Sequence, residues 1–184
     1  MKNIGLIGCG NIAETYFRSQ DYFNNINFIA CADKFPEAAK KCAEQYKIKS
    51  LTVDEILNDS DVDVILNLTI PQAHYEISKL ALESGKHVYS EKPMSIKYDE
   101  AKELVELANK KNLYIGNAPD TFLGGGGQVA RQFIDKGEIG EVLTGNFIFA
   151  FPGVQEFHPN PESWFQSGGG PVIDMGPYFF TTLV

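Results

Sequence analysis

Short apolar runs alternate with longer segments of helical periodicity through the first part of the chain. The apolar runs cover residues 4–7, 28–32, 62–68, 87–89 and 113–115, and each predicts a buried strand. Apolar positions recur at helical spacing over residues 11–20, 36–46, 72–84 and 98–108 between them. Continuously apolar strands that alternate with helices are typical of a parallel sheet covered on both faces. We therefore predict a doubly wound α/β domain of the Rossmann type over residues 1–118.

The pattern of apolar positions changes after residue 118. A glycine-rich entry at residues 124–127 precedes a predicted helix at 128–135, and residues 142–151 predict a longer aromatic strand. The last residues before 184 read as an unfinished apolar helix. We therefore expect residues 119–184 to be the N-terminal part of an α+β second domain, truncated before its sheet is complete.

A glycine loop follows the first predicted strand and opens the first helix. In Gly8-Cys9-Gly10-Asn11-Ile12-Ala13, the first glycine permits a tight turn and the second allows the backbone to approach a pyrophosphate. The small Ala13 allows helix and strand to pack closely. We predict a dinucleotide site with contacts from Gly8, Gly10, Asn11 and Ile12; the alternative is a tight turn in a fold that binds no nucleotide.

An acidic residue, Asp33, ends the second predicted strand. A carboxylate at this place can accept hydrogen bonds from the ribose hydroxyls of the adenosine and repels a 2′-phosphate. We therefore predict NAD rather than NADP as the cofactor. The neighbouring Lys34 could compensate for the repulsion, which leaves NADP open.

Composition excludes several other classes of protein. The formal net charge of −8 argues against a nucleic-acid partner, since phosphate binding needs clustered Lys and Arg. Neither a signal peptide nor an apolar run near the roughly 20 residues of a membrane span is present, so we expect a cytoplasmic protein. Cys9, Cys31 and Cys42 lack metal-ligand spacing, and we expect buried, reduced thiols and no metal site.

Two further motifs carry a family resemblance. Glu91-Lys92-Pro93 follows the fourth predicted strand, and Gly-Gly-Gly-Pro-Val-Ile-Asp-Met-Gly-Pro-Tyr occupies residues 168–178. Together with the glycine loop, in this order and spacing, they resemble the glucose-fructose oxidoreductase / inositol dehydrogenase / rhizopine-catabolism (Gfo/Idh/MocA) family. The resemblance covers essentially the whole chain. It implies that the chain is the N-terminal half of an oxidoreductase that is a homo-oligomer at full length.

The resemblance also implies catalytic roles. Lys92 would hold the substrate oxygen and stabilise negative charge on it; the alternative is a surface lysine before a turn. Many family members have His four residues after the Asp that corresponds to Asp174, whereas this chain has Tyr178. A subgroup of the family uses Tyr there, so we predict Tyr178 as acid/base and Asp174 as an orienting group. The alternative is that Tyr178 is a packed aromatic residue beside Phe179.

Weaker candidates follow the later strands. The resemblance implies that the segment containing Thr69, Pro71 and His74 lines the cofactor, together with Glu91 and Lys92; His74 is alternatively a partly exposed helix residue. Asn117 and Asp120 follow the fifth predicted strand, where they either touch the substrate or shape the turn around Pro119.

These inferences predict an NAD(P)-dependent oxidoreductase. It would transfer hydride between nicotinamide and a sugar, a polyol or a related hydroxy or carbonyl substrate. The alternative is a non-catalytic dinucleotide sensor or regulatory protein of the same fold. Substrate specificity is expected to depend on residues after Val184.

Overall fold

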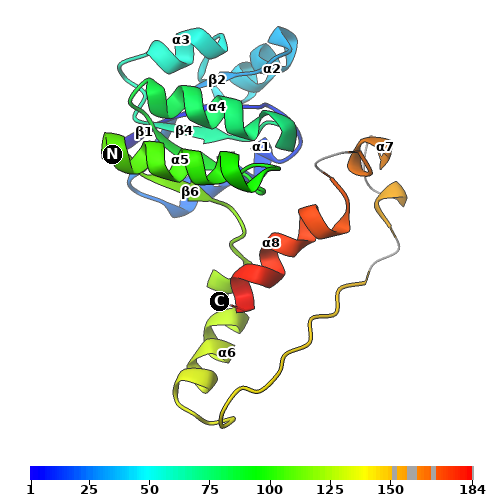
Figure 1. The fold of residues 1–184 in the computed structure, drawn as a ribbon. Coiled ribbons are helices and arrows are strands. Elements are labelled where there is room, and N and C mark those ends of the chain that lie inside the picture. The colour runs from blue at the N-terminus through cyan, green and yellow to red at the C-terminus, as the bar shows by residue number, and fades with distance from the viewer. Residues whose placement is uncertain (151–152, 157–160, 167–168, 184) are drawn as a thin grey trace. The chain divides into compact units, whose positions relative to one another are not determined.

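Six parallel strands form the centre of the first of two units into which the chain divides, Met1–Ala118 and Pro119–Val184. The computed structural model (Figure 1) describes residues 1–150, 153–156, 161–166 and 169–183. The strand order is β3-β2-β1-β4-β5-β6, so the chain builds outward from β1 first in one direction and then in the other. This is the doubly wound Rossmann arrangement that the alternation of apolar runs predicts.

The strands of this sheet agree with the predicted apolar runs to within a few residues. They are β1 (Lys2–Ile7), β2 (Ile26–Ala32), β3 (Lys49–Ser50), β4 (Val64–Asn67), β5 (His87–Ser90) and β6 (Ile115–Asn117). The last strand begins two residues later than the pattern of residues 113–115 suggests. The two-residue β3 was not predicted, because two exposed residues give no apolar run.

The helices of the first unit connect these strands. They are α1 (Ala13–Ser19), the 3₁₀ turn η1 (Gln20–Tyr22), α2 (Pro36–Tyr46), α3 (Val53–Asn58), α4 (Pro71–Glu83) and α5 (Tyr98–Lys111). Pro36 and Pro71 occupy the first helical positions of α2 and α4, where a missing N–H costs nothing. The short α3 was not predicted from apolar periodicity.

Two apolar clusters cover the two faces of the sheet. On one face, Ala13 and Phe17 of α1 and Cys42 of α2 pack against Leu6 and Phe28 of the strands. On the other face the buried side chains come from α3, α4 and α5, and Figure 1 shows α4 and α5 side by side. Successive strand residues point to opposite faces, so both faces of β1 and β4 are buried. Packing on both faces therefore holds the strands in place. The loops that follow the strands lie together at the carboxyl ends of the strands.

The second unit consists of helices joined by irregular segments. It contains η2 (Thr121–Leu123), α6 (Gly125–Asp135), η3 (Val154–Glu156), α7 (Pro161–Trp164) and α8 (Pro171–Leu183). Both α6 and α8 contact η2. The expected helix at residues 128–135 is present within α6, and the apolar end of the chain is helical in α8.

The predicted strand at residues 142–151 is not present in its described part, residues 142–150. This segment has no strand partner among the described residues, and a strand requires a neighbour for its ladder of hydrogen bonds. Its aromatic side chains pack on a helix instead: the rings of Phe147 and Phe149 lie 5.2 Å and 6.1 Å from the ring of Phe179 in α8.

Within the residues that the structure describes, no helix combines the length and the apolar character that crossing a bilayer requires.

Candidate functional site

The register of the sheet places the ends of four strands in one row. Ile7 at the end of β1 pairs with Ala32 of β2 on one side and with Asn67 of β4 on the other. Asn67 in turn pairs with Ser90 at the end of β5. Since all these strands are parallel, the loops that follow them leave the sheet at the same edge. The predicted cofactor residues of the first unit all lie in these loops or in the first turns of the helices that they open.

The glycine loop after β1 has a conformation that its first glycine makes possible. Gly8 has φ of 103°, and a Cβ at this position would lie 2.5 Å from the carbonyl oxygen of Leu68. A side chain at Gly10, in contrast, would meet no atom within 4 Å. The backbone at Gly10 therefore borders open space. Ala13 is buried against the sheet, and no side chain caps α1 at Ile12.

Asp33, directly after β2, is tied to this loop. Its Oδ2 accepts a 2.7 Å hydrogen bond from the backbone N–H of Cys9, and its Oδ1 accepts one of 2.8 Å from the N–H of Phe35. An ionised carboxylate has about four lone-pair sites, so two sites remain for further donors. Lys34 next to it is exposed.

A buried network of polar side chains supports the loop after β4. The side chain of Asn67 is fully buried; its Oδ1 accepts hydrogen bonds from the N–H and hydroxyl of Thr69 at 3.2 Å and 2.7 Å. Its Nδ2 donates to the carbonyl of His74 and to the hydroxyl of Ser78, each at 3.0 Å. Sequence reasoning missed Asn67; a polar residue in an apolar strand was the available signal.

His74 connects the loop after β4 to the loop after β5. It is 1% exposed, with Nδ1 2.6 Å from the carbonyl oxygen of Pro93 and Nε2 2.9 Å from that of Thr69. Both ring nitrogens therefore face backbone oxygens of the loops after β5 and β4. The partly exposed helix histidine that the sequence left as an alternative is not observed. Pro71 begins α4 and is half-buried.

The loop after β5 carries Glu91 and Lys92, both half-buried. The carboxylate of Glu91 accepts a 2.7 Å hydrogen bond from the hydroxyl of Tyr16 in α1 and one of 3.0 Å from the N–H of Lys92. The side-chain amide of Asn117, at the end of β6, donates to the carbonyl oxygens of Ser90 and Glu91 at 3.0 Å and 2.9 Å. Asn117 thus supports this loop, as does Tyr16, which sequence reasoning missed because nothing local marks it.

Asp174 and Tyr178 lie in the second unit, on α8. They are four residues apart, so they lie on neighbouring turns of one helix face. Both are half-buried. The structure therefore brings these two residues together on one face of α8. The other predicted site residues belong to the first unit.

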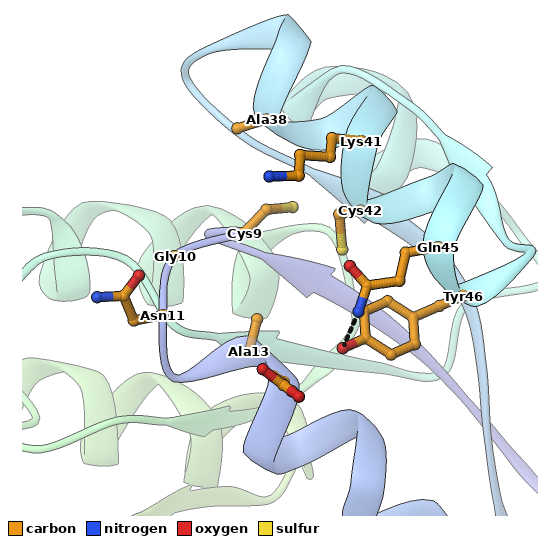
Figure 2. A pocket seen from close by; sticks show the side chains of 10 residues that line it. Cys9, Gly10, Asn11, Ala13, Ala38, Lys41, Cys42, Gln45 and Tyr46 are labelled. Atoms are coloured by element: carbon orange, nitrogen blue, oxygen red, sulfur yellow. Dashed lines mark hydrogen bonds between the residues drawn. The ribbon is translucent and has the colours of Figure 1, made fainter.

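A cavity of about 350 Å³ adjoins the glycine loop (Figure 2). Its walls come from the loop, the start of α1 and one side of α2. The lining residues are Cys9, Gly10, Asn11, Ala13, Glu14, Ala38, Lys41, Cys42, Gln45 and Tyr46. Gly10 and Asn11, two of the predicted cofactor residues, thus border a space between the glycine loop and α2.

Comparison with known proteins agrees with this geometry. Residues 2–118 match the oxidoreductase family with an NAD-binding Rossmann fold, GFO/IDH/MocA, and residues 128–184 match the C-terminal domain of the same family. A dTDP-3,4-didehydro-2,6-dideoxy-alpha-D-glucose 3-reductase of Saccharopolyspora spinosa is 28% identical over 179 residues, covering 95% of this chain and 53% of that protein. An inositol 2-dehydrogenase of Rhizobium meliloti is 27% identical over 143 residues, covering 75% of this chain and 42% of that protein.

A solved structure shares the fold over nearly the whole chain. The 3-ketoreductase KijD10 of Actinomadura kijaniata, crystallised with NADP and TDP-benzene, superposes with a TM-score of 0.84 at 24% identity, covering 95% of this chain and 54% of that one. The chain thus spans about half the length of the relatives named here. With family matches to both units and the glycine loop, Asp33 and Lys92 at one sheet edge, this chain belongs to the Gfo/Idh/MocA oxidoreductase family.

Proposed function

We propose that this chain is the cofactor-binding part of an NAD(P)-dependent oxidoreductase that acts on a sugar, a polyol or a related hydroxy or carbonyl compound. The observation that carries the proposal is the row of loops at the carboxyl edge of the sheet. It aligns the glycine loop, Asp33, Thr69 and Lys92 along one side of a parallel sheet. In open α/β sheets, ligands bind at this edge. The family match and the named reductase and dehydrogenase relatives support the same reaction class.

The first unit fits a dinucleotide. Gly10 leaves open space where a side chain would block a pyrophosphate, and Gly8 permits the turn that exposes the loop backbone. The spare lone pairs of Asp33 suit the two hydroxyls of an adenosine ribose, and its charge disfavours a 2′-phosphate. We therefore propose NAD as the preferred cofactor and NADP as the weaker one. When bound, the nicotinamide ring supplies the hydride donor or acceptor.

The other predicted cofactor residues at the carboxyl edge of the sheet have two kinds of role in this proposal. Thr69, Pro71, Asn11 and Ile12 line the cofactor directly from the loops after β4 and β1. His74 and Glu91 contribute by holding the loops after β4 and β5. The ring nitrogens of His74 face the carbonyl oxygens of Thr69 and Pro93. The carboxylate of Glu91 accepts hydrogen bonds from Tyr16 and from the N–H of Lys92. Replacing His74 or Glu91 would therefore move the loop that carries Lys92.

Three residues would perform the chemistry on the substrate. The ammonium of Lys92 holds the substrate oxygen and stabilises negative charge that develops on it. The phenol of Tyr178 takes the hydroxyl proton during oxidation and returns it during reduction. Asp174, on the adjacent turn of α8, orients the substrate or Lys92. The phenol at position 178 and the lysine at 92 favour an enzyme over a dinucleotide sensor.

The second unit would supply the start of the substrate and dimerisation domain. Its described part has apolar side chains that are strongly exposed, among them Leu143 at 86% and Ile148 at 90%. Side chains of this kind suit burial against further protein. We propose a homo-oligomer in a reducing cytoplasm, consistent with three unpaired thiols.

The proposal is tested by measuring NADH formation by the full-length protein with a panel of aldoses, inositols and deoxysugar nucleotides, and NADH consumption with the matching ketones. We expect turnover with at least one compound of the panel. Tight binding of NADH, measured by fluorescence titration, without turnover of any compound would contradict the enzyme and support the sensor. Failure to bind either NADH or NADPH would contradict both.

A further inference from the structure

Three cysteines that are far apart in the sequence meet beside the glycine loop. Cys9 lies in the loop after β1, Cys31 lies within β2, and Cys42 lies on α2. Their three Sγ atoms all lie within 4.8 Å of one another. Figure 2 shows the sulfur atoms of Cys9 and Cys42 facing the same space. The packing of α2 on β2, beside the loop after β1, therefore brings the three sulfur atoms together.

The triangle is protected on one side and reachable on the other. Cys31 and Cys42 are buried, whereas Cys9 is half-buried. Both Cys9 and Cys42 line the cavity of about 350 Å³ beside α2. An ion can therefore reach the sulfur atoms through this cavity, while Cys31 closes the triangle from the strand side.

The three thiols must lose their protons when a metal binds. Thiolate is the form of cysteine that binds metal.

The ligand set selects the kind of metal. Soft thiolate ligands select ions such as Cu⁺ and Zn²⁺. Structural zinc requires four ligands, and within the described residues no histidine, aspartate, glutamate or further cysteine joins this group. A monovalent d¹⁰ ion is satisfied by two or three sulfur atoms. We propose that Cys9, Cys31 and Cys42 form a three-sulfur binding site for one Cu⁺ ion.

The geometry needs only a small adjustment. Metal–sulfur bonds of about 2.3 Å in a trigonal site place the sulfur atoms about 4 Å apart. The separations of at most 4.8 Å in the structure close to this value by small rotations about the Cα–Cβ bonds. As the sulfur–copper bonds form, the thiol protons pass to water, and the copper stays in the monovalent state throughout.

The test is a titration of the purified, reduced protein with Cu⁺, supplied anaerobically as its acetonitrile complex against the chelator bathocuproine disulfonate. We expect one Cu⁺ per chain by native mass spectrometry. The substitutions Cys9→Ser, Cys31→Ser and Cys42→Ser should each weaken binding by more than about 100-fold, since even outer-shell partners of metal ligands are worth 10–100-fold. Met94→Leu, which removes a sulfur atom elsewhere in the first unit, is the matched control and should bind as the wild type does.

A second measurement needs no variant. Bound Cu⁺ should slow the alkylation of Cys9, the half-buried thiol, by iodoacetamide relative to the copper-free protein, as read by peptide mass spectrometry. An unchanged rate of alkylation of Cys9 would overturn the site. So would binding of Zn²⁺ but not Cu⁺, or copper affinity that survives the loss of Cys9. Oxidation of the cluster to a disulfide without retention of the ion would point to a redox pair instead. None of these readouts depends on cofactor binding or turnover.

Discussion

The backbone N–H of Cys9 donates a 2.7 Å hydrogen bond to Oδ2 of Asp33. This bond joins the loop after β1 to the loop after β2, and these two strands are neighbours in the sheet. The same carboxylate also receives the N–H of Phe35. Asp33 therefore both shapes the glycine loop and, in the proposed function, presents its remaining lone pairs to the cofactor.

Replacing Asp33 should weaken cofactor binding. Asp33→Asn removes the negative charge and leaves an amide NH₂ group that cannot accept a backbone N–H. Because hydrogen bonds to charged groups are worth about 1.5–3 kcal/mol, we expect NADH affinity to fall roughly 10- to 100-fold. NADPH affinity should fall less, since a repulsion is relieved. Fluorescence titration measures both, and Asp99→Asn in the exposed first turn of α5 is the control. A wild type that binds NADPH more tightly than NADH would contradict the assignment.

Alanine substitutions of the two loop glycines should differ in their effects on stability and on NADH affinity. Gly8→Ala places a Cβ 2.5 Å from the carbonyl of Leu68 at a φ of 103°, so we expect a stability loss of about 2 kcal/mol or more. Gly10→Ala meets no atom within 4 Å and should leave the free energy of unfolding within about 0.5 kcal/mol. It should nevertheless reduce NADH affinity by more than about tenfold, because the methyl group enters the space of the pyrophosphate. Urea unfolding and NADH titration of both variants separate the effects; unaltered NADH binding by Gly10→Ala would contradict the proposed pose.

Loss of the phenol of Tyr178 should affect turnover and not cofactor binding. A positioned acid/base contributes about 10²- to 10⁴-fold to a rate, so Tyr178→Phe should lower kcat by that order. The Kd for NADH should stay within a factor of about two, since the substitution keeps the ring and removes one hydroxyl. Tyr98→Phe, at a phenol that is 82% exposed on α5, is the matched control. Equal kcat values for the two variants would assign Tyr178 to packing beside Phe179.

The buried amide of Asn67 should be important for stability and for the site. Asn67→Ala leaves the hydroxyl of Thr69 and the carbonyl of His74 without their buried partner. We expect the free energy of unfolding to fall by about 2–4 kcal/mol. NADH affinity should fall as well, because Thr69 loses its support. Asn109→Ala on the exposed side of α5 is the control for urea unfolding, and a stability loss no larger than that of this control would contradict the network.

Acid should weaken the junction between β1 and β4. Hydrogen bonds from the N–H of Asn3 and from the ammonium of Lys2 lower the pKa of Asp63. Because the folded pKa lies below the unfolded value of about 3.9, this contribution is present above that pH and is lost as the pH falls through the folded pKa. Asp63→Asn should therefore lower stability at pH 7 and flatten its decline below about pH 4. Urea unfolding across pH 3–7 measures this; parallel curves for the two proteins would contradict it.

Local signals explain why much of the first unit was predictable. The bounds of α2 coincide with the predicted residues 36–46, because a first-turn proline and regular periodicity mark both the start and the body of the helix. The loop at Gly8 was predictable because only glycine adopts its φ without strain. The helix α3 was missed although Thr52 and Glu55 form a capping box, a signal independent of periodicity that sequence reasoning did not use.

Other features depend on partners that the sequence does not identify. Residues 142–150 have the alternation of a strand, yet without a neighbouring strand among the described residues their aromatic rings pack on Phe179. His74 looks like an ordinary helix residue, and its burial follows from the approach of the Pro93 carbonyl from another loop. The hydrophobic pattern of a segment gives its preference for a helix or a strand. The segments that pack around it decide whether that preference is realised.

The sequence by itself determined the alternation of strands and helices, the glycine turn and the acid after the second strand, because each depends on residues close together along the chain. The tertiary structure alone decided that Asn67 anchors Thr69, that Tyr16 holds Glu91, and that three cysteines meet. Cys9, Cys31 and Cys42 have no recognisable spacing, since they come from a loop, a strand and a helix. They converge because α2 packs on β2, beside the loop after β1, and burial of apolar surface, not the thiols, drives that packing.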